Sequence, residues 1–219
     1  MLRMIIIGPQ GSGKGTYASR LSPIYNIPQI ATGDLIREEI KSKTEVGMKI
    51  EGIVKEGKLV PDEIVLGILK KRLEKDDTKN GFILDGYPRT LSQAKALEGI
   101  TQIDVVLNLV VPQKVIIERL STRIICPKCG AIYNKKTLPP KVEGICDKCG
   151  AALIQRDDDK PAAIKARLAT FKKETAPVIE YYKNKGIVIN IKPKDPNAAP
   201  EDVVKEIVEK IDKFLKVQK

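Results

Sequence analysis

The chain has 219 residues, and 39 lysine and arginine side chains against 28 acidic ones give a formal net charge of +11. This length fits one domain with small inserts, and the charge favours a polyanionic partner such as a phosphate-rich substrate, nucleic acid or an anionic membrane. The absence of histidine excludes Ser-His-Asp and Cys-His catalysis, HExxH metal sites and zinc fingers with histidine ligands.

Short apolar runs, taken in chain order, predict the strands of a parallel sheet, because strands that are apolar throughout are buried on both faces. The runs lie at 2–7, 27–30, 81–85, 103–111 and 186–191. Helical patterns begin near Lys14, after Pro61, after Pro112 and near Pro200, and a proline-rich loop is expected over 192–200. This alternation of strands and helices predicts a doubly wound α/β fold.

No membrane attachment is expected from the sequence. No apolar run approaches the roughly 20 residues that span a bilayer. The apolar start of the chain ends at Gly8 and Pro9, which makes it too short for a signal-peptide core. We therefore expect a cytoplasmic protein.

Four cysteines form a compact pattern, C-x2-C-x16-C-x2-C, at Cys126, Cys129, Cys146 and Cys149. Each CxxC pair is followed by glycine, which is typical of a zinc knuckle, and two knuckles supply tetrahedral S4 coordination. Four thiolates fill the shell of the metal, so the site is expected to be structural. Two disulfides are the alternative, which a chain without a secretion signal disfavours. Iron is a second candidate metal.

The segment GPQGSGKGT at 8–16 fits the phosphate-binding pattern GxxxxGK. A strand precedes it and a helix follows, so backbone N–H groups and the helix N-terminus would surround phosphate oxygens, with Lys14 as the point charge. The residue after Lys14 is Gly15, and the hydroxyl comes one position later at Thr16. The usual Ser/Thr ligand of Mg²⁺ is therefore displaced.

Two further features point to phosphate chemistry. Asp85 ends a buried strand in the sequence DGYPR, where a carboxylate beside a phosphate loop would hold Mg²⁺ directly or through its waters, and Arg89 could grip a phosphate with both nitrogens. Arginines, whose planar fork suits phosphoryl oxygens, also stand near turns and at the edges of the cysteine segment. They are Arg37, Arg119, Arg123, Arg156 and Arg167.

Together these motifs resemble the adenylate kinase family, in the long-lid form whose lid holds zinc. The matching segments, in order along nearly the whole chain, are GPQGSGKGT (8–16), ATGDLIR (31–37), GKLVPDE (57–63), DGYPRT (85–90), LSTR (120–123), the four-cysteine segment with Pro139 and Pro140, RDD (156–158) and Arg167. The resemblance implies a P-loop NTPase-type parallel sheet of about five strands. It also implies a core at 1–30, 61–122 and 161–219, a helical AMP-binding flap at 31–60 and a zinc-ribbon-like lid at 123–160.

The resemblance further implies reversible phosphoryl transfer, ATP + AMP = 2 ADP, by a monomer that uses Mg²⁺ with ATP and a structural Zn²⁺. The implied ATP site is Gly11, Ser12, Gly13, Lys14, Gly15, Thr16, Arg119, Arg123, Ile132 and Tyr133. The implied AMP site is Thr32, Arg37, Lys58, Leu59, Val60, Gly86, Tyr87, Pro88, Arg89, Gln93, Arg156 and Arg167. The implied catalytic residues are Lys14, Arg89, Arg123, Arg156 and Arg167, with Asp85 at Mg²⁺ through water.

This sequence departs from the family pattern at three places. Gln10 replaces a usual second proline of the loop, and Ile124 replaces a usual arginine of the lid. The polar run after the lid is altered at 157–161, which leaves the lid hinge unassigned.

Two other functions remain open from the sequence. A kinase for UMP, CMP or GMP would share the loop and the arginines and differ in the acceptor pocket. A zinc-ribbon nucleic-acid-binding ATPase would fit the +11 charge and the four cysteines, but aromatic residues make up only 4% of the chain, which leaves few stacking partners for bases. No nucleic-acid partner is therefore expected.

Overall fold

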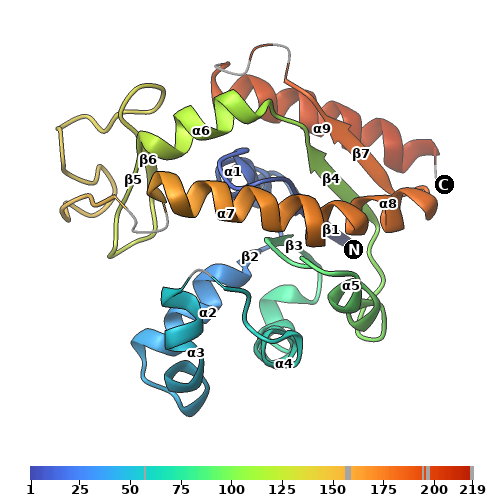
Figure 1. Ribbon diagram of the computed structural model, residues 1–219. Coiled ribbons are helices and arrows are strands. Elements are labelled where there is room, and N and C mark those ends of the chain that lie inside the picture. The colour runs from blue at the N-terminus through green and yellow to red at the C-terminus, as the bar shows by residue number, and fades with distance from the viewer. Residues whose placement is uncertain (57, 156–158, 194, 196–197, 218–219) are drawn as a thin grey trace.

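The computed structural model describes residues 1–56, 58–155, 159–193, 195 and 198–217 (Figure 1). A parallel sheet of five strands lies at its centre, in the order β2-β3-β1-β4-β7. The strands are β1 (Leu2–Ile7), β2 (Gln29–Ala31), β3 (Gly81–Asp85), β4 (Val105–Leu109) and β7 (Val188–Ile191). The five-stranded parallel sheet predicted from the sequence is confirmed.

Three strands differ in their bounds from the apolar runs that predicted them. The N–H of Ile27 bonds back to Ser22 at the end of the first helix, so β2 begins only at Gln29. The N–H of Ile187 likewise closes the preceding helix on Tyr182, so β7 begins at Val188. The run at 103–111 is wrong at both ends, because β4 covers only Val105–Leu109, where it pairs with its neighbours. Burial continues before the paired part of β2 and β4, at Ile27 and Ile103, but Val110 after β4 is exposed.

Both faces of the sheet are buried, as the alternation along β1 demonstrates. Met4 and Ile6 pack with α1 (Lys14–Tyr25) and α9 (Pro200–Val217), whereas Ile5 and Ile7 belong to the core on the opposite face. The opposite face is covered by α4 (Asp62–Leu73), α5 (Leu91–Glu98) and α8 (Ala176–Asn184). The side-chain period of two therefore places successive isoleucines in two separate cores, as a doubly wound fold requires.

Two segments project from this core (Figure 1). Helices α2 (Thr32–Lys41) and α3 (Glu45–Lys55) follow β2, and the antiparallel pair β5 (Arg123–Ile125) and β6 (Ile132–Asn134) follows α6 (Gln113–Ser121). A further helix, α7 (Pro161–Thr170), continues through a π-helical turn at Phe171–Thr175 into α8, and a short 3-10 turn spans Asp76–Thr78. The helical segment after β2 and the small hairpin after α6 agree with the expected inserts in their secondary structure.

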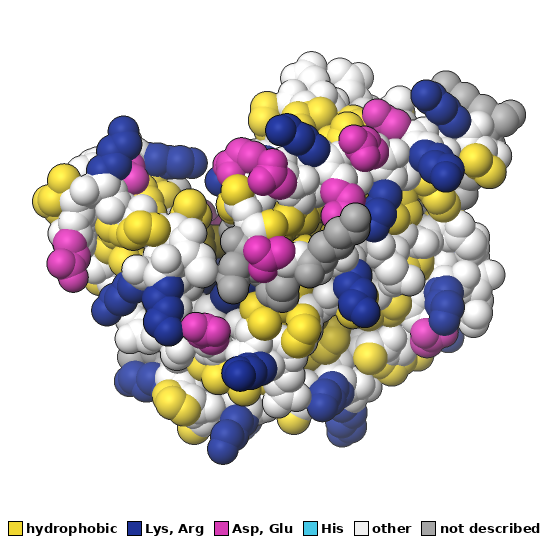
Figure 2. Space-filling view, turned by 90° about the horizontal axis from the view of Figure 1, so that it is seen from above, with side chains coloured by type: hydrophobic (Ala, Val, Ile, Leu, Met, Phe, Trp, Pro, Cys, Tyr) yellow, Lys and Arg dark blue, Asp and Glu magenta, His cyan; other side chains and the backbone are white. Residues whose placement is uncertain are grey.

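The surface carries charges of both signs. On the face in Figure 2, lysine and arginine side chains are spread over the molecule with acidic side chains between them. Within the described part of the chain, no helix combines the length and the apolar character needed to cross a bilayer.

Candidate functional site: a cationic cleft at the carboxyl ends of the strands

The phosphate-loop segment connects β1 directly to α1. Gly11 and Gly13 adopt φ values of +80° and +100°, and a Cβ at Gly13 would lie 2.8 Å from the ring of Tyr17. Side chains at these positions would be strained by the backbone and by the helix. The loop therefore closes tightly, and the Lys14 ammonium folds back over it to donate to the carbonyls of Gly8 at 2.8 Å and Pro9 at 3.0 Å.

The Lys14 ammonium lies in a buried and strongly cationic setting. Burial lowers its pKa from the ordinary 10.5 to about 8. The Asp85 carboxylate acts against this change, while Arg89, Arg167 and Arg123 lower the pKa further. Three guanidinium groups therefore act electrostatically on Lys14, and among the causes of its shift only Asp85 favours the charged form. An incoming polyanion would relieve this repulsion.

Asp85 is the last residue of β3, and in the sheet it lies beside Ile6 of β1, near the start of the phosphate loop. The side chain of Gln29 donates to its Oδ2 at 3.1 Å. A Cβ at Gly15 would lie 3.3 Å from the same oxygen, so the missing side chain of Gly15 leaves room for Asp85. Burial raises the pKa of Asp85, and Lys14 opposes this change. An oxygen donor of this kind suits Mg²⁺.

The Arg89 guanidinium is fixed by the turn that follows Asp85. Its Nε donates to the Gly86 carbonyl at 2.8 Å, and its backbone carbonyl accepts the Thr175 hydroxyl at 3.0 Å. Burial, with a contribution from the neighbouring Arg167, lowers the pKa of Arg89 to about 10. A hydroxyl from Thr32 also donates to the Gly86 carbonyl, at 3.0 Å. This carbonyl therefore anchors both Arg89 and the start of α2.

A second guanidinium, that of Arg123 at the start of β5, is held by Asp159. Its Nε and Nη2 donate to the two carboxylate oxygens at 2.8 and 2.5 Å. The Asp159 side chain is fully buried, and its Oδ1 also accepts the side-chain amide of Gln10 at 3.2 Å. Gln10 is the residue that departs from the family pattern, and here it connects the phosphate loop with the two ends of the four-cysteine segment.

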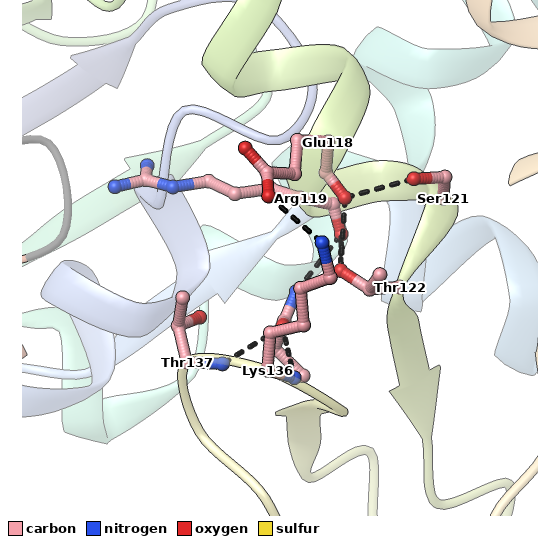
Figure 3. A network of polar contacts seen from close by, with 7 residues as sticks. Glu118, Arg119, Ser121, Thr122, Lys136 and Thr137 are labelled. Atoms are coloured by element: carbon pink, nitrogen blue, oxygen red, sulfur yellow. Dashed lines mark hydrogen bonds and ion pairs between the residues drawn. The ribbon is translucent and has the colours of Figure 1, made fainter.

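The base of that segment is tied to α6 by a network of polar contacts that includes Glu118, Thr122 and Lys136 (Figure 3). The Asn134 amide donates to the Arg119 carbonyl at 3.0 Å and to the Thr122 hydroxyl at 2.8 Å, and its oxygen accepts the N–H groups of Lys136 and Thr137. Lys136 also pairs with Glu118 at 3.0 Å. The Arg119 guanidinium extends away from this network, and lies 3.4 Å from the carbonyls of Gly11 and Ser12.

The four cysteine sulfur atoms gather in one cluster, all within 4.8 Å of one another. The shortest separations are 3.3 Å between Cys126 and Cys149 and 3.5 Å between Cys129 and Cys146. A disulfide needs about 2.05 Å, so the alternative of two disulfides is wrong, and all four thiols are free. Tetrahedral zinc with Zn–S distances of about 2.3 Å requires sulfur atoms roughly 3.8 Å apart, which this cluster fits.

A cleft of about 960 Å³ brings the nucleotide-binding candidates together. Every predicted nucleotide-binding residue in the described part of the chain lines it except Ser12, which is buried. Arg156 lies outside the described residues. Tyr133 lines the cleft, and its hydroxyl contacts the Cys146 sulfur at 3.5 Å and accepts the Asp147 N–H at 2.8 Å. Arg37 pairs with the exposed Asp34 on its own helix.

Sequence reasoning missed several residues that organise this cleft. They are Gln29 and Thr175, described above, Asp159, and Asp62, which bonds to Gln93. Asp62 lies within the GKLVPDE segment and Asp159 within the altered run at 157–161. Both segments were singled out from the sequence, so these two residues could have been considered as site residues. The sequence carried no such signal for Thr175, because its contact with Arg89 spans 86 positions of the chain.

Comparison with known proteins agrees with this geometry. The family model for adenylate kinase matches residues 6–187. Adenylate kinase of Methanosarcina mazei is 49% identical over 208 residues, which cover 92% of this chain and 96% of that protein. Adenylate kinases of Caldicellulosiruptor saccharolyticus and Archaeoglobus fulgidus are 49% and 46% identical, each over 94% of this chain and over 97% and 96% of their own lengths. The chain therefore belongs to the adenylate kinase family.

Proposed function

We propose that this chain transfers a phosphoryl group reversibly between ATP and AMP, giving two molecules of ADP, and so balances the adenine nucleotides of the cell. The observation that carries the proposal is the gathering of Lys14, Arg89, Arg123 and Arg167 around one cleft, where burial and then the three arginine charges lower the pKa of Lys14. An ammonium and several guanidinium groups in a shared cleft suit a reaction between two phosphate groups.

The proposed mechanism needs no general base, because the attacking oxygen belongs to a phosphate that is already anionic. Lys14 would stabilise the transferred group, since its ammonium lies over the phosphate loop. Arg89 would orient the acceptor phosphate, and Arg123 and Arg167 would stabilise charge that develops during transfer. Catalysis would therefore rest on alignment and on preorganised positive charge.

Magnesium would enter with ATP. The oxygen donor that would hold the ion through its waters is Asp85, half-buried beside Gly15. When bound, the ion would neutralise part of the charge on the phosphates. Structural zinc would occupy the cluster of four thiols and hold a segment whose own apolar core is small.

We propose residues 31–60 as an AMP-binding flap, 123–160 as a lid, and 1–30, 61–122 and 161–219 as the core. Water would attack ATP in place of AMP, so closure of flap and lid over the cleft would exclude it. The protein would act as a monomer, because the residues proposed for ATP and those proposed for AMP line this one cleft. Four free cysteines support a reducing compartment such as the cytoplasm.

A coupled assay of ADP formation from ATP tests this proposal, with AMP, CMP, UMP, GMP or no acceptor present. Fast turnover with AMP is expected. Fast turnover with another monophosphate, and not with AMP, would support phosphoryl transfer but would show that AMP is not the acceptor. ADP release without an acceptor, stimulated by nucleic acid, would favour the nucleic-acid-binding ATPase that the sequence left open.

A further inference from the structure

The side-chain amide of Gln93 is held at both of its ends. Gln93 lies in the first turn of α5, lines the cleft and is only 3% exposed. Its Oε1 accepts the backbone N–H of Arg89 at 2.7 Å. Its Nε2 donates to Oδ1 of Asp62 at 2.7 Å. Both ends of this amide therefore make short hydrogen bonds to groups of the protein.

The chemistry of these two partners permits one orientation of the amide. An ionised carboxylate only accepts hydrogen bonds, and a backbone N–H only donates them. A reversed amide at Gln93 would set N–H against the N–H of Arg89 and an oxygen against the carboxylate of Asp62, so both bonds would be lost. The two partners therefore determine which end of the Gln93 amide is the oxygen and which is the nitrogen.

Asp62 is itself held in place for this contact. Its second oxygen, Oδ2, accepts the Thr90 hydroxyl at 2.9 Å, and the same hydroxyl accepts the backbone N–H of Gln93 at 3.1 Å. Asp62 begins α4, where a carboxylate interacts favourably with the helix N-terminus. It does not belong to the described lining of the cleft. Any effect of Asp62 on a ligand would therefore pass through Gln93.

The fixed amide of Gln93 offers a ligand one arrangement of hydrogen-bond donor and acceptor. After its two bonds within the protein, Gln93 retains one N–H and one oxygen lone pair. Adenine and cytosine present a ring nitrogen acceptor next to an amino donor, which complements that pair. Guanine, hypoxanthine and uracil present a ring N–H next to a carbonyl oxygen, which opposes it at both positions.

We propose that Asp62 is a positioning residue that fixes the polarity of the Gln93 amide and so makes the acceptor pocket select a base with an amino group over one with a carbonyl group. This inference rests on the proposed function, because it concerns the acceptor nucleotide of that reaction. Sites that hydrogen-bond a base edge discriminate because the wrong base leaves buried groups unpaired.

AMP and IMP form the matched pair that isolates this effect. The two nucleotides have almost the same size and charge, and they differ in the amino or carbonyl group at C6 and in the proton at N1. We expect the wild-type chain to prefer AMP over IMP in kcat/KM by about 100-fold, the upper range for a bidentate base contact. A general loss of packing would change both nucleotides alike, whereas loss of polarity changes their ratio.

The variants Asp62→Ala and Asp62→Ser remove the acceptor that fixes Gln93, and Asp62→Asn retains an oxygen in its place. Glu63→Gln is the matched control, because Glu63 is the next acidic residue of the same helical turn and is exposed. We expect the AMP/IMP ratio to fall about tenfold in the first two variants, mainly through KM for AMP. Asp62→Asn and Glu63→Gln should keep it within about threefold.

Calorimetric titration with AMP and IMP on the same variants separates this inference from the proposed function, because binding does not require transfer. A folded Asp62→Ala or Asp62→Ser protein with an unchanged AMP/IMP ratio would overturn the inference, as would equal losses for both nucleotides. Wild-type protein that binds AMP over IMP yet forms no ADP would overturn the proposed function and leave base selection by Asp62 intact.

Discussion

Arg123 and Asp159 form a two-pronged ion pair, with contacts of 2.8 and 2.5 Å, across the start of β5 and the residues that lead into α7. The pair is largely withdrawn from solvent, since the exposed fractions of the two side chains are 13% and 0%. Gln10 of the phosphate loop bonds to the same carboxylate at 3.2 Å. One buried carboxylate thus fixes a cationic side chain of the cleft relative to the loop beneath it.

Replacing Asp159 should therefore reduce both stability and turnover. Asp159→Asn leaves the Arg123 charge buried without its counter-charge, which we expect to cost about 3 kcal/mol of unfolding free energy, and to lower kcat about tenfold. Urea denaturation and steady-state kinetics measure the two effects. Asp76→Asn is the control, because Asp76 pairs with Lys79 at 2.7 Å while 91% exposed. Equal unfolding free energies for Asp159→Asn and wild type would contradict this account of the pair.

The buried Lys14 ammonium predicts a fall of activity at alkaline pH. In the free protein its pKa lies near 8, so the charge that binds phosphate is present below this pH and is lost above it. We expect kcat/KM for MgATP to be level up to about pH 7.5 and to decline by up to tenfold per unit above pH 8, since this parameter reports the free enzyme. The break in kcat should come at higher pH, because bound phosphates favour the charged form.

A pH series with Lys14→Arg provides the matched comparison, since guanidinium remains charged over this range. Its activity should be lower throughout, without the decline near pH 8. A wild-type kcat/KM that stays level to about pH 9.5 would show that Lys14 holds its proton in the free protein.

Removing the Arg89 guanidinium should reduce turnover far more than it reduces stability. Arg89→Ala removes the hydrogen bond from the guanidinium to the Gly86 carbonyl. It also removes the cost of burying this charge and its repulsion from Arg167, so the net loss of stability should be small. We expect kcat to fall about 10²–10³-fold, the scale for one lost transition-state donor.

Arg72→Ala is the control for Arg89→Ala. Arg72 pairs with Asp77 at 2.6 Å, lies outside the described lining of the cleft and is 17% exposed. Its turnover should stay within about twofold of wild type, because it touches no reacting group. Wild-type turnover in a folded Arg89→Ala protein would show that Arg89 has no part in the reaction.

Metal removal should lower the melting temperature. The segment that contains the four cysteines buries few apolar side chains of its own, chiefly Ile124 and Tyr133 beside the sulfur atoms. We expect stripping of the metal by a chelator to lower the melting temperature by roughly 5–10 °C, which corresponds to about 2–3 kcal/mol for a chain of this size. Added Zn²⁺ should restore it. Identical melting curves with and without metal would rule out a structural ion.

Much of this architecture could be predicted because local signals and tertiary structure agree. The strand at 2–7 and the phosphate loop behind it combine an apolar run with glycines whose backbone angles only glycine adopts readily. The cysteine spacing likewise predicted the sulfur cluster, because two tight knuckles bring thiols together wherever the segment lies. These features depend on residues that are close in sequence.

Contacts between distant segments were beyond such reasoning. The hydrogen bond between Gln93 and Asp62 spans 31 positions, and the contact of Gln10 with Asp159 spans 149. Neither a helix period nor a spacing motif encodes such partners, since they depend on how the flanking elements pack.

Direct transfer between two nucleotides is the central claim, and the fate of labelled phosphate tests it most directly. ATP labelled in its γ-phosphate is mixed with AMP and the wild-type chain, and the products are separated after rapid quenching. The account predicts that the label appears in the β-phosphate of ADP, with almost none in inorganic phosphate. Label released as inorganic phosphate at the rate of ATP consumption would show that water is the acceptor and would contradict the account.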